Sequence, residues 1–448
     1  MKQKIRIGGG AGFSGDRLEP AVLLAEKGEL DYLVLECLAE RTVGLAQKCK
    51  LQDATKGYDP LLERRIESLL PHLVKNKIRL ISNMGAANPV EGAKKIIEIA
   101  QKQGLNVKVA AVIGDDISDE VRAMSHEFLK FGNENFAIEL INQHQSSIIS
   151  ADAYLGIEGI LEALQGDAQI IITGRVADPS LFLAPMIHEF EWKTDDYVLM
   201  GKGTVIGHLM ECAGHITGGY FADPIKKPVD GMDNLGHPFA DVFADGSAII
   251  SKVEGTGGVV NLQTAKEQLL YEVINPHEYF TPDVVADFTS VMLEEVGKNQ
   301  IKVTGGSGKT KPQTLKVSLG YKAFYLGEGE ISYAGSSAYE RAKLAAETIE
   351  KRLQGRFEEM RVDYIGVNSI FSNANIQPAN IPEIRLRIAV KAKTQAEAAI
   401  IGEEVEALYT NGPAGGGGVR KYVNEIIGIA SILVDRNCIK TQITYFES

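Results

Sequence analysis

The first half of the chain alternates short apolar or β-branched runs with longer amphipathic stretches. This order is typical of a sheet built from alternating β-strands and α-helices. The predicted strands are 4–8, 31–36, 78–82, 107–113 and 169–173, and the predicted helices between them are 20–27, 60–75, 89–103 and 156–164. We therefore predict an α/β fold with a largely parallel sheet.

Several predicted helices follow a capping side chain and a proline, as in Asn88-Pro89 and Asp178-Pro179. Proline is tolerated at the first helical position because the N–H that it lacks has no partner there, and Asn or Asp can accept a hydrogen bond from the first turn. Glu91 follows Asn88 at the spacing of a capping box. We therefore predict that Asn88 and Asp178 cap helices.

The pattern changes in the C-terminal part of the chain. The predicted elements there are strand 315–324, helix 338–353, strands 362–371 and 383–391, helix 395–408 and strand 422–434. The order β-α-β-β-α-β is that of a ferredoxin-like α+β domain. We divide the chain into an α/β ligand-binding domain (1–194), a glycine-rich central segment that completes the site (195–310) and a ferredoxin-like domain (311–448).

Charge and composition exclude several classes of protein. The chain has 47 basic and 59 acidic residues among 448, a net charge of -12, which disfavours binding to nucleic acid or to an anionic membrane. Its apolar runs are shorter than the roughly 18 residues that cross a bilayer. The four cysteines form no C-x-x-C pair, so neither a disulfide framework nor a structural zinc site is indicated. We expect a cytoplasmic homo-oligomer.

The glycine run Gly10–Gly15 fits the dinucleotide-binding pattern G-x-G-x-x-G after an apolar strand. In that motif the helix opens within the glycine turn and directs its N–H groups at the pyrophosphate. Pro20 instead marks a first helical turn several residues later. We favour a substrate or anion loop with Gly10, Gly12, Ser14 and Asp16 as candidate binding residues, while a structural turn and a dinucleotide site remain alternatives.

Residues 207–215 contain the densest cluster of reactive side chains. In a helix, His208, Glu211 and His215 share one face, and Cys212 lies on it too. Such a face can bind a metal or pair an imidazole with a carboxylate for acid–base chemistry. We take His208, Glu211 and Cys212 as candidate catalytic residues. A structural polar face is the alternative, no cofactor is predicted, and a divalent metal stays open.

Other polar residues follow predicted strands, where α/β sheets bind ligands. Arg175 follows strand 169–173 and can hold a carboxylate or phosphate through two hydrogen bonds. Glu36 and Glu40 can divide acid and base roles or hold a cation if they converge. The candidate substrate-binding residues are Gly10, Gly12, Ser14, Asp16, Asn83, Asn88, Arg175, Asp178 and Tyr220. We expect His208, Glu211 and Arg175 to line one pocket.

Ordered blocks over most of the chain resemble the acyclic terpene utilisation (AtuA) family. The blocks are 8–16, 28–34 with 38–40, 83–89, 172–179, 207–212, 217–224 and 327–333. The resemblance implies catabolism of acyclic terpenes and related acids, with a carboxylate or acyl-CoA substrate and a hydratase or lyase step. We expect an enzyme that works by proton transfer. The alternatives are a non-catalytic ligand-binding or assembly subunit and, from the glycine run alone, a nucleotide-dependent oxidoreductase.

Overall fold

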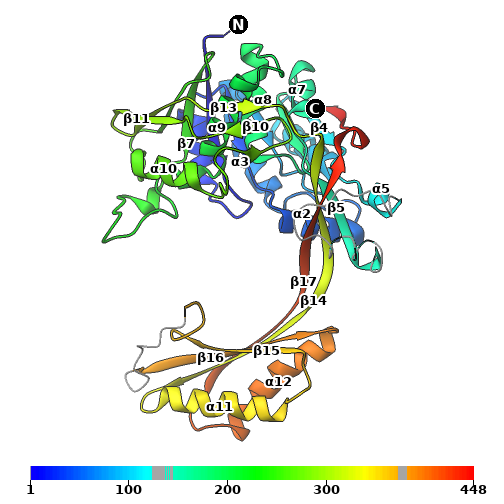
Figure 1. Ribbon diagram of the computed structural model, residues 1–448, viewed down its shortest axis with the longest axis vertical. Helices are drawn as coiled ribbons and strands as arrows, with labels where there is room; N and C mark the ends of the chain where they lie inside the picture. Colours follow the sequence, from blue (N-terminus) through cyan, green and yellow to red (C-terminus); the bar gives the residue numbers. More distant parts are fainter. Residues whose placement is uncertain (1, 124–136, 138, 140, 142–144, 372–380) are drawn as a thin grey trace. The chain divides into compact units, whose positions relative to one another are not determined.

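The computed structural model describes residues 2–123, 137, 139, 141, 145–371 and 381–448, which form two compact units (Figure 1). Unit 1 comprises Met1–Gly320 and Ile429–Ser448, and unit 2 comprises Tyr321–Gly428. Strands β14 (Thr314–Ala334) and β17 (Gly417–Asp435) belong partly to each unit. In the described part of the chain, no helix is long and apolar enough to cross a membrane.

Unit 1 is built on a ten-stranded sheet of order β11-β12-β8-β7-β1-β2-β3-β6-β4-β18. The central strands β1, β2, β3, β6 and β4 are parallel, and the flanking strands pair antiparallel. Their bounds are β1 (Lys4–Ala11), β2 (Tyr32–Leu35), β3 (Arg79–Ser82), β6 (Ile170–Thr173), β4 (Lys108–Ile113), β7 (Pro238–Phe243), β8 (Ala248–Lys252), β12 (Gln300–Thr304), β11 (Met292–Gly297) and β18 (Gln442–Glu447). The predicted α/β class is confirmed, but the sheet is mixed and is parallel only at its centre.

One face of this sheet is covered by three amphipathic helices. They are α1 (Glu19–Lys27), α3 (Leu62–Asn76) and α4 (Pro89–Gln103). In α3 the residues Leu62, Ile66, Leu69 and Leu73 are buried, and this spacing places them on one helical face. They join a core that includes Leu33 of β2.

The opposite face is covered by α7 (Glu158–Gln165), α8 (Asp178–Phe190) and α9 (Tyr197–Glu211). Tyr32 and Leu33 are neighbours in β2, so their side chains point to opposite faces of the sheet. The Tyr32 hydroxyl donates to Glu189 in α8 at 2.6 Å. Helices α8 and α9 pack on each other and are buried on most sides, which explains their apolar composition. The sheet is therefore the middle of three layers.

The remaining elements of unit 1 surround these layers. They are α2 (Glu40–Gln52), α5 (Ser118–Ala123), β5 (Ile148–Ala153), α10 (Leu262–Leu270), the small sheet of β13 (Ser307–Lys309), β10 (Val285–Asp287) and β9 (Tyr279–Phe280), and the short 3-10 turns η1 (Gln145–Ser147), η2 (Ala213–His215), η3 (Met232–Asn234) and η5 (Arg436–Cys438). Strand β5 pairs with β14. The pairing brings residues near 154 and 316 together, since the Tyr154 N–H donates to the Lys316 carbonyl at 2.8 Å.

Unit 2 follows the order β14, α11 (Ala338–Arg352), β15 (Glu359–Ile365), β16 (Glu383–Ala392), α12 (Gln395–Asn411) and β17. Its strands lie in the order β15-β16-β14-β17. Alternate residues of β16, Ile384 and Leu386 among them, are buried with the inner faces of both helices. Glu328 and Glu330 of β14 pair with Arg387 and Arg385, so these acids are held by structural ion pairs.

Two helix caps predicted from the sequence are wrong. Asn88 precedes α4, but its side chain makes no hydrogen bond to the first turn of the helix. Its Nδ2 instead donates to the carbonyl oxygens of Ala54 at 2.9 Å and Lys56 at 2.7 Å. Asp178 is the first residue of α8, and its Oδ1 accepts from Arg175 Nη1 at 3.2 Å. In both places a tertiary partner holds the side chain that the local pattern assigned to the helix end.

Candidate functional site

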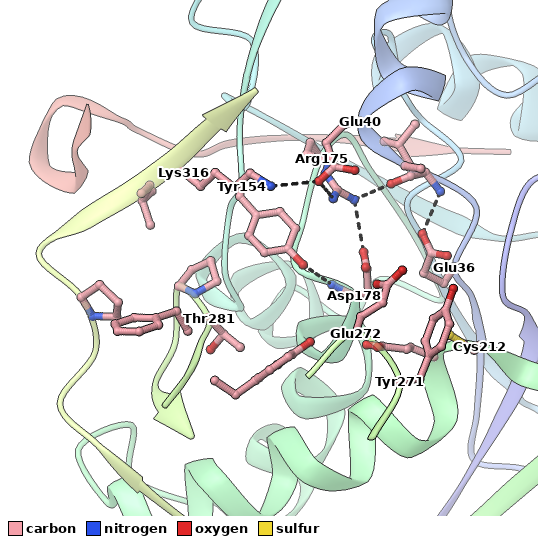
Figure 2. A pocket seen from close by; sticks show the side chains of 18 of the residues that line it. Glu36, Glu40, Tyr154, Arg175, Asp178, Cys212, Tyr271, Glu272, Thr281 and Lys316 are labelled. Carbon is pink, nitrogen blue, oxygen red and sulfur yellow. Dashed lines mark hydrogen bonds and ion pairs between the residues drawn. The ribbon is translucent and has the colours of Figure 1, made fainter. Parts of the chain in front are cut away.

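A cavity of about 740 Å³ lies at the carboxyl ends of the central parallel strands of unit 1 (Figure 2). Gly12 directly follows β1, Glu36 directly follows β2, and Arg175 follows β6 by two residues. Parallel strands end at one edge of the sheet, and ligands of α/β proteins bind there. We call this space the acidic cavity because five carboxyl side chains line it: Glu36, Glu40, Asp178, Glu211 and Glu272.

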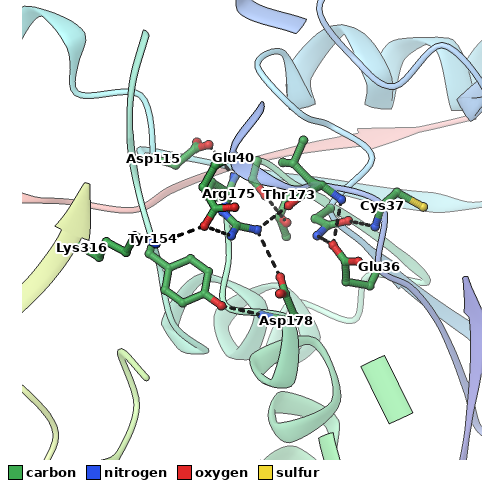
Figure 3. A network of polar contacts seen from close by, with 12 residues as sticks. Glu36, Cys37, Glu40, Asp115, Tyr154, Thr173, Arg175, Asp178 and Lys316 are labelled. Atoms are coloured by element: carbon green, nitrogen blue, oxygen red, sulfur yellow. Dashed lines mark hydrogen bonds and ion pairs between the residues drawn. The ribbon is translucent and has the colours of Figure 1, made fainter. Parts of the chain in front are cut away.

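Arg175 organises one wall of the acidic cavity (Figure 3). Its guanidinium donates to Glu40 Oε1 at 3.1 Å, to Asp178 Oδ1 at 3.2 Å and to the carbonyl of Leu38. The guanidinium also lies 4.6 Å from the ring centre of Tyr154, a cation–π distance. With a side chain only 5% exposed, Arg175 is already engaged by the protein.

Glu40 is the one carboxyl group of the cavity that is held between two cations. It accepts from Arg175 and, at 3.2 Å, from Lys316 Nζ. Burial raises the pKa of Glu40, but the attraction of Arg175 and Lys316 outweighs burial and lowers this pKa to about 2. Glu40 is therefore ionised at neutral pH.

Glu36 has the opposite environment. Its Oε1 accepts from Asn83 Nδ2 at 2.9 Å and from the Leu38 N–H at 2.8 Å. Burial raises the pKa of Glu36 to about 7, since the hydrogen bonds from Asn83 and Leu38 offset only part of the desolvation. Asn83 itself is anchored, because its Oδ1 accepts from the Cys37 N–H at 2.7 Å. A carboxyl group with this pKa can both accept and give a proton near pH 7.

Asp178 lies beside Arg175 and also has a perturbed pKa. Burial, and next the negative charge of Glu36, raise the pKa of Asp178 well above its ordinary value despite the nearby Arg175. The Asp178 N–H donates to the Tyr154 hydroxyl at 3.3 Å. Asp178 therefore holds a proton more readily than an ordinary aspartate.

Glu211 ends α9 and is paired with a fully buried histidine. His208 Nδ1 lies 2.9 Å from Glu211 Oε1. The imidazole packs against both Tyr279 and Phe288, with ring centres 5.4 and 5.3 Å away. Burial raises the pKa of Glu211. Glu211 lines the cavity, whereas His208 lies behind it, so the structure brings Arg175 and Glu211 to one cavity and leaves His208 out of its lining.

The predicted helical face through His208, Glu211, Cys212 and His215 is only partly correct. Helix α9 ends at Glu211, and Ala213 has a left-handed backbone with a φ of 41°. His215 consequently lies in the turn η2. Cys212 lines the acidic cavity, but burial and the negative charge of Glu211 raise the pKa of its thiol. Because the thiolate is the nucleophile, this environment does not favour nucleophilic chemistry.

A second cavity, of about 450 Å³, shares Gly12, Cys212 and Tyr271 with the first. We call it the aromatic cavity because its lining includes the rings of Phe13, His215, Tyr220, His237 and Tyr271. The structure places two further predicted binding residues, Asp16 and Tyr220, here. The predicted residues thus divide between two adjoining spaces.

Four predicted binding residues line neither cavity: Asn83, which holds Glu36 from behind, and Gly10, Ser14 and Asn88. The Gly10 carbonyl accepts from His237 Nδ1 at 3.1 Å, the Ser14 carbonyl accepts from Arg65 Nη2 at 3.0 Å, and Asn88 holds the loop at 54–56. The glycines are needed for close packing: a Cβ on Gly12 would lie 2.5 Å from the carbonyl carbon of Cys212. Since α1 begins at Glu19, after the glycine run, the loop has no helix N-terminus of the dinucleotide type.

The sequence analysis missed several residues of the acidic cavity. They are Tyr154, Tyr271, Glu272, Tyr279 and Lys316. Tyr154 directly follows β5, but Ser150 and Asp152 interrupt that strand, so no apolar run marked it in the sequence. Among the residues that the structure describes, no group of three or more His, Cys, Asp or Glu side chains has an arrangement that could hold a metal ion.

The comparisons with known proteins agree with the motifs. A family model described as acyclic terpene utilisation family protein AtuA matches residues 5–445. No curated protein and no solved structure matches the chain. The family match extends over both units and over every residue of the two cavities.

Proposed function

The chain belongs to the acyclic terpene utilisation family AtuA, which suggests a role in the use of acyclic terpenes, and from that premise we propose that it is an enzyme of carboxylate or acyl-CoA catabolism. The reaction proposed is of the hydratase or lyase type. One group removes a proton from the carbon next to the carbonyl, and another protonates the leaving hydroxyl, which departs as water. Such chemistry needs one basic and one acidic group on the same substrate.

The observation that supports this reaction is the separation of carboxyl pKa values within one cavity. The pKa of Glu40 lies at about 2 and that of Glu36 at about 7, and that of Asp178 is raised well above its ordinary value. Environments that separate the pKa values of neighbouring acids are typical of acid–base catalysis. We assign Glu36 as the general base and Asp178 as the general acid.

The cations of the cavity support a carboxylate or a thioester substrate. Arg175 and Lys316 are the two cationic side chains in its lining. Arg175 already serves Glu40 and Asp178, whereas the side chain of Lys316 is 38% exposed. We therefore assign the contact with a substrate carboxylate to Lys316, and we assign Arg175 to positioning the two acids.

Hydrogen–deuterium exchange tests the proposal without knowledge of the product. The protein is incubated in D₂O with a panel of short branched and linear carboxylic acids and their CoA thioesters, and deuterium at the carbon next to the carbonyl is measured by mass spectrometry. We expect incorporation into at least one member of the panel. Glu36→Gln should slow that incorporation at least 100-fold, since general-base catalysis contributes about 10²–10⁴-fold.

Glu98→Gln is the matched control, because Glu98 is an exposed residue of α4 paired with Lys95 outside both cavities. This variant should exchange at the wild-type rate. Absence of exchange with every compound, or equal rates for the wild type and Glu36→Gln, would contradict the proposed function.

We further propose that unit 2 is a ferredoxin-like domain. The chain order β14-α11-β15-β16-α12-β17 and the sheet order β15-β16-β14-β17 support this assignment. The domain limits, the cytoplasmic location and the homo-oligomer stay predictions. Light scattering at micromolar concentration checks the last of these, and a monomer would contradict it.

A further inference from the structure

The acidic and aromatic cavities adjoin each other. Gly12, Cys212 and Tyr271 line both spaces. Gly12 packs directly against Cys212, because a Cβ at Gly12 would lie 2.7 Å from the Cys212 Cα. The two cavities therefore share part of their wall.

The wall of the aromatic cavity is formed by flat and uncharged rings. His215 stacks on Tyr220 with ring centres 5.3 Å apart and an angle of 10°, and Tyr271 meets His215 edge-on at 5.0 Å. Burial lowers the pKa values of His215 and His237, so both imidazoles are neutral at pH 7. This wall differs from the carboxyl-lined wall of the neighbouring space.

The charged lining residues of the aromatic cavity already have protein partners. Asp16 Oδ2 accepts from the Gly12 N–H at 2.9 Å. Arg17 Nη1 donates to the Asp233 carbonyl at 2.8 Å. The surface offered to a ligand is therefore mainly uncharged, and five rings contribute to it.

Tyr220 gives independent support for a binding role. Its side chain is 90% exposed, so it buries little apolar surface in the fold. Its backbone has a φ of 58°, which is unfavourable for a bulky residue and occurs where another requirement holds it. Phe13, also in the lining, is 60% exposed. Fold stability does not account for two exposed rings beside a cavity, whereas stacking on a ligand does.

We propose that the aromatic cavity binds a flat, uncharged group of the same substrate whose carbonyl end reacts in the acidic cavity. The proposal rests on the proposed function for the position of the reacting end. It adds a substrate class: carboxylates or acyl thioesters that carry an unsaturated or aromatic group a few bonds from the carbonyl. Contacts to this non-reacting group hold the reacting end in place.

Two probes that differ in ring shape test the proposal. 3-Phenylpropanoate and 3-cyclohexylpropanoate share their carboxylate and chain length, but only the first has a flat ring. Dissociation constants are measured by calorimetry for the wild type, Tyr220→Ala and Phe13→Ala. Phe371→Ala is the matched control, because Phe371 is an exposed aromatic residue of unit 2, 76% exposed.

We expect the wild type to bind the phenyl probe more tightly than the cyclohexyl probe. Tyr220→Ala and Phe13→Ala should each weaken the phenyl probe about 3- to 10-fold, in the range of an aromatic pair, and should change the cyclohexyl probe less than 2-fold. Phe371→Ala should change neither. Failure of the phenyl probe to bind the wild type, equal affinity for the two probes, or equal losses of both in Tyr220→Ala overturns the proposal.

This measurement separates the two proposals because it needs no turnover. Ring preference that depends on Tyr220, together with absence of deuterium exchange, contradicts only the proposed reaction. Deuterium exchange without any ring preference contradicts only the assignment of the aromatic cavity.

Discussion

Replacement of Arg175 by methionine tests how the acidic cavity is held together. Arg175→Met keeps much of the apolar stem but removes the cation that serves Glu40, Asp178 and the Leu38 carbonyl. Removing one partner of a buried ion pair costs about 3–5 kcal/mol. Adding the free energies of the separate charged hydrogen bonds gives a larger loss of stability. That sum is too large, because Glu40 still accepts a hydrogen bond from Lys316 in the variant and its side chain is 33% exposed. We expect the free energy of unfolding of unit 1 to fall by about 3–4 kcal/mol at pH 7.

The stability deficit of Arg175→Met should depend on pH. In the wild type the pKa of Glu40 is lowered to about 2, so Glu40 contributes stability above its unfolded pKa, and this contribution is lost as the pH falls toward 2. The variant loses part of that contribution. Arg175 also lowers the pKa of Glu36, which is about 7 in the wild type, so this pKa rises without the cation and burying an ionised Glu36 costs more as the pH rises above 7. The deficit should therefore be larger near pH 8 than near pH 5.

Urea unfolding followed by tryptophan fluorescence measures this deficit. Trp192 is the single tryptophan of the chain and is buried in unit 1, so its signal reports that unit. Lys94→Met is the control, because Lys94 is 50% exposed and pairs with Glu91 on the surface of α4, and such a pair is worth at most about 1 kcal/mol. The reasoning is refuted if Arg175→Met costs no more than the control, or if its deficit is the same at pH 5 and pH 8.

Two more predictions concern Gly12 in the cavity wall and Asn83 behind it. Gly12→Ala should lower the free energy of unfolding by about 1–3 kcal/mol because its Cβ would lie 2.5 Å from the backbone of Cys212. Gly417→Ala is the control, because a Cβ there meets nothing within 4 Å, and its free energy of unfolding should stay within about 0.5 kcal/mol of the wild type. Equal urea midpoints for the two variants would contradict the packing argument. Asn83→Ala should raise the pKa of Glu36 above about 7, since it removes a hydrogen bond to the ionised carboxylate. The pH dependence of deuterium exchange measures this pKa, and a lower value would contradict the assignment.

The local elements of the fold were predictable, whereas pairings between distant segments were not. The apolar run 169–173 alone indicates a buried strand, and it forms β6. Strand β18 pairs with β4 through residues more than 300 positions apart, as in Thr444 and Ala111. No local pattern carries such a pairing, and β18 was missed. Helix α2 was missed because few of its residues are buried, so its apolar periodicity is weak.

The candidate site was predictable where it depends on strand ends. Glu36 and Arg175 follow strands that the sequence indicates, and parallel strands bring such residues to one edge. Lys316 enters the cavity through the pairing of β14 with β5, which the sequence analysis did not predict. His215 was misplaced because the helical spacing was extended past Gly214, although glycine is a frequent signal for a helix end.

The charge balance of the acidic cavity explains why its carboxyl groups have different pKa values. Five carboxyl side chains line the cavity with two cations, and Glu40 takes a bond from each cation. Glu36 is left with neutral donors, and Glu211 with a buried histidine. Burying a carboxylate without a neighbouring cation costs free energy, so the carboxyl groups that lack a cation have raised pKa values. The cavity thus holds an ionised Glu40 beside carboxyl groups whose pKa values are raised, and such a separation of pKa values is what acid–base chemistry on a bound substrate requires.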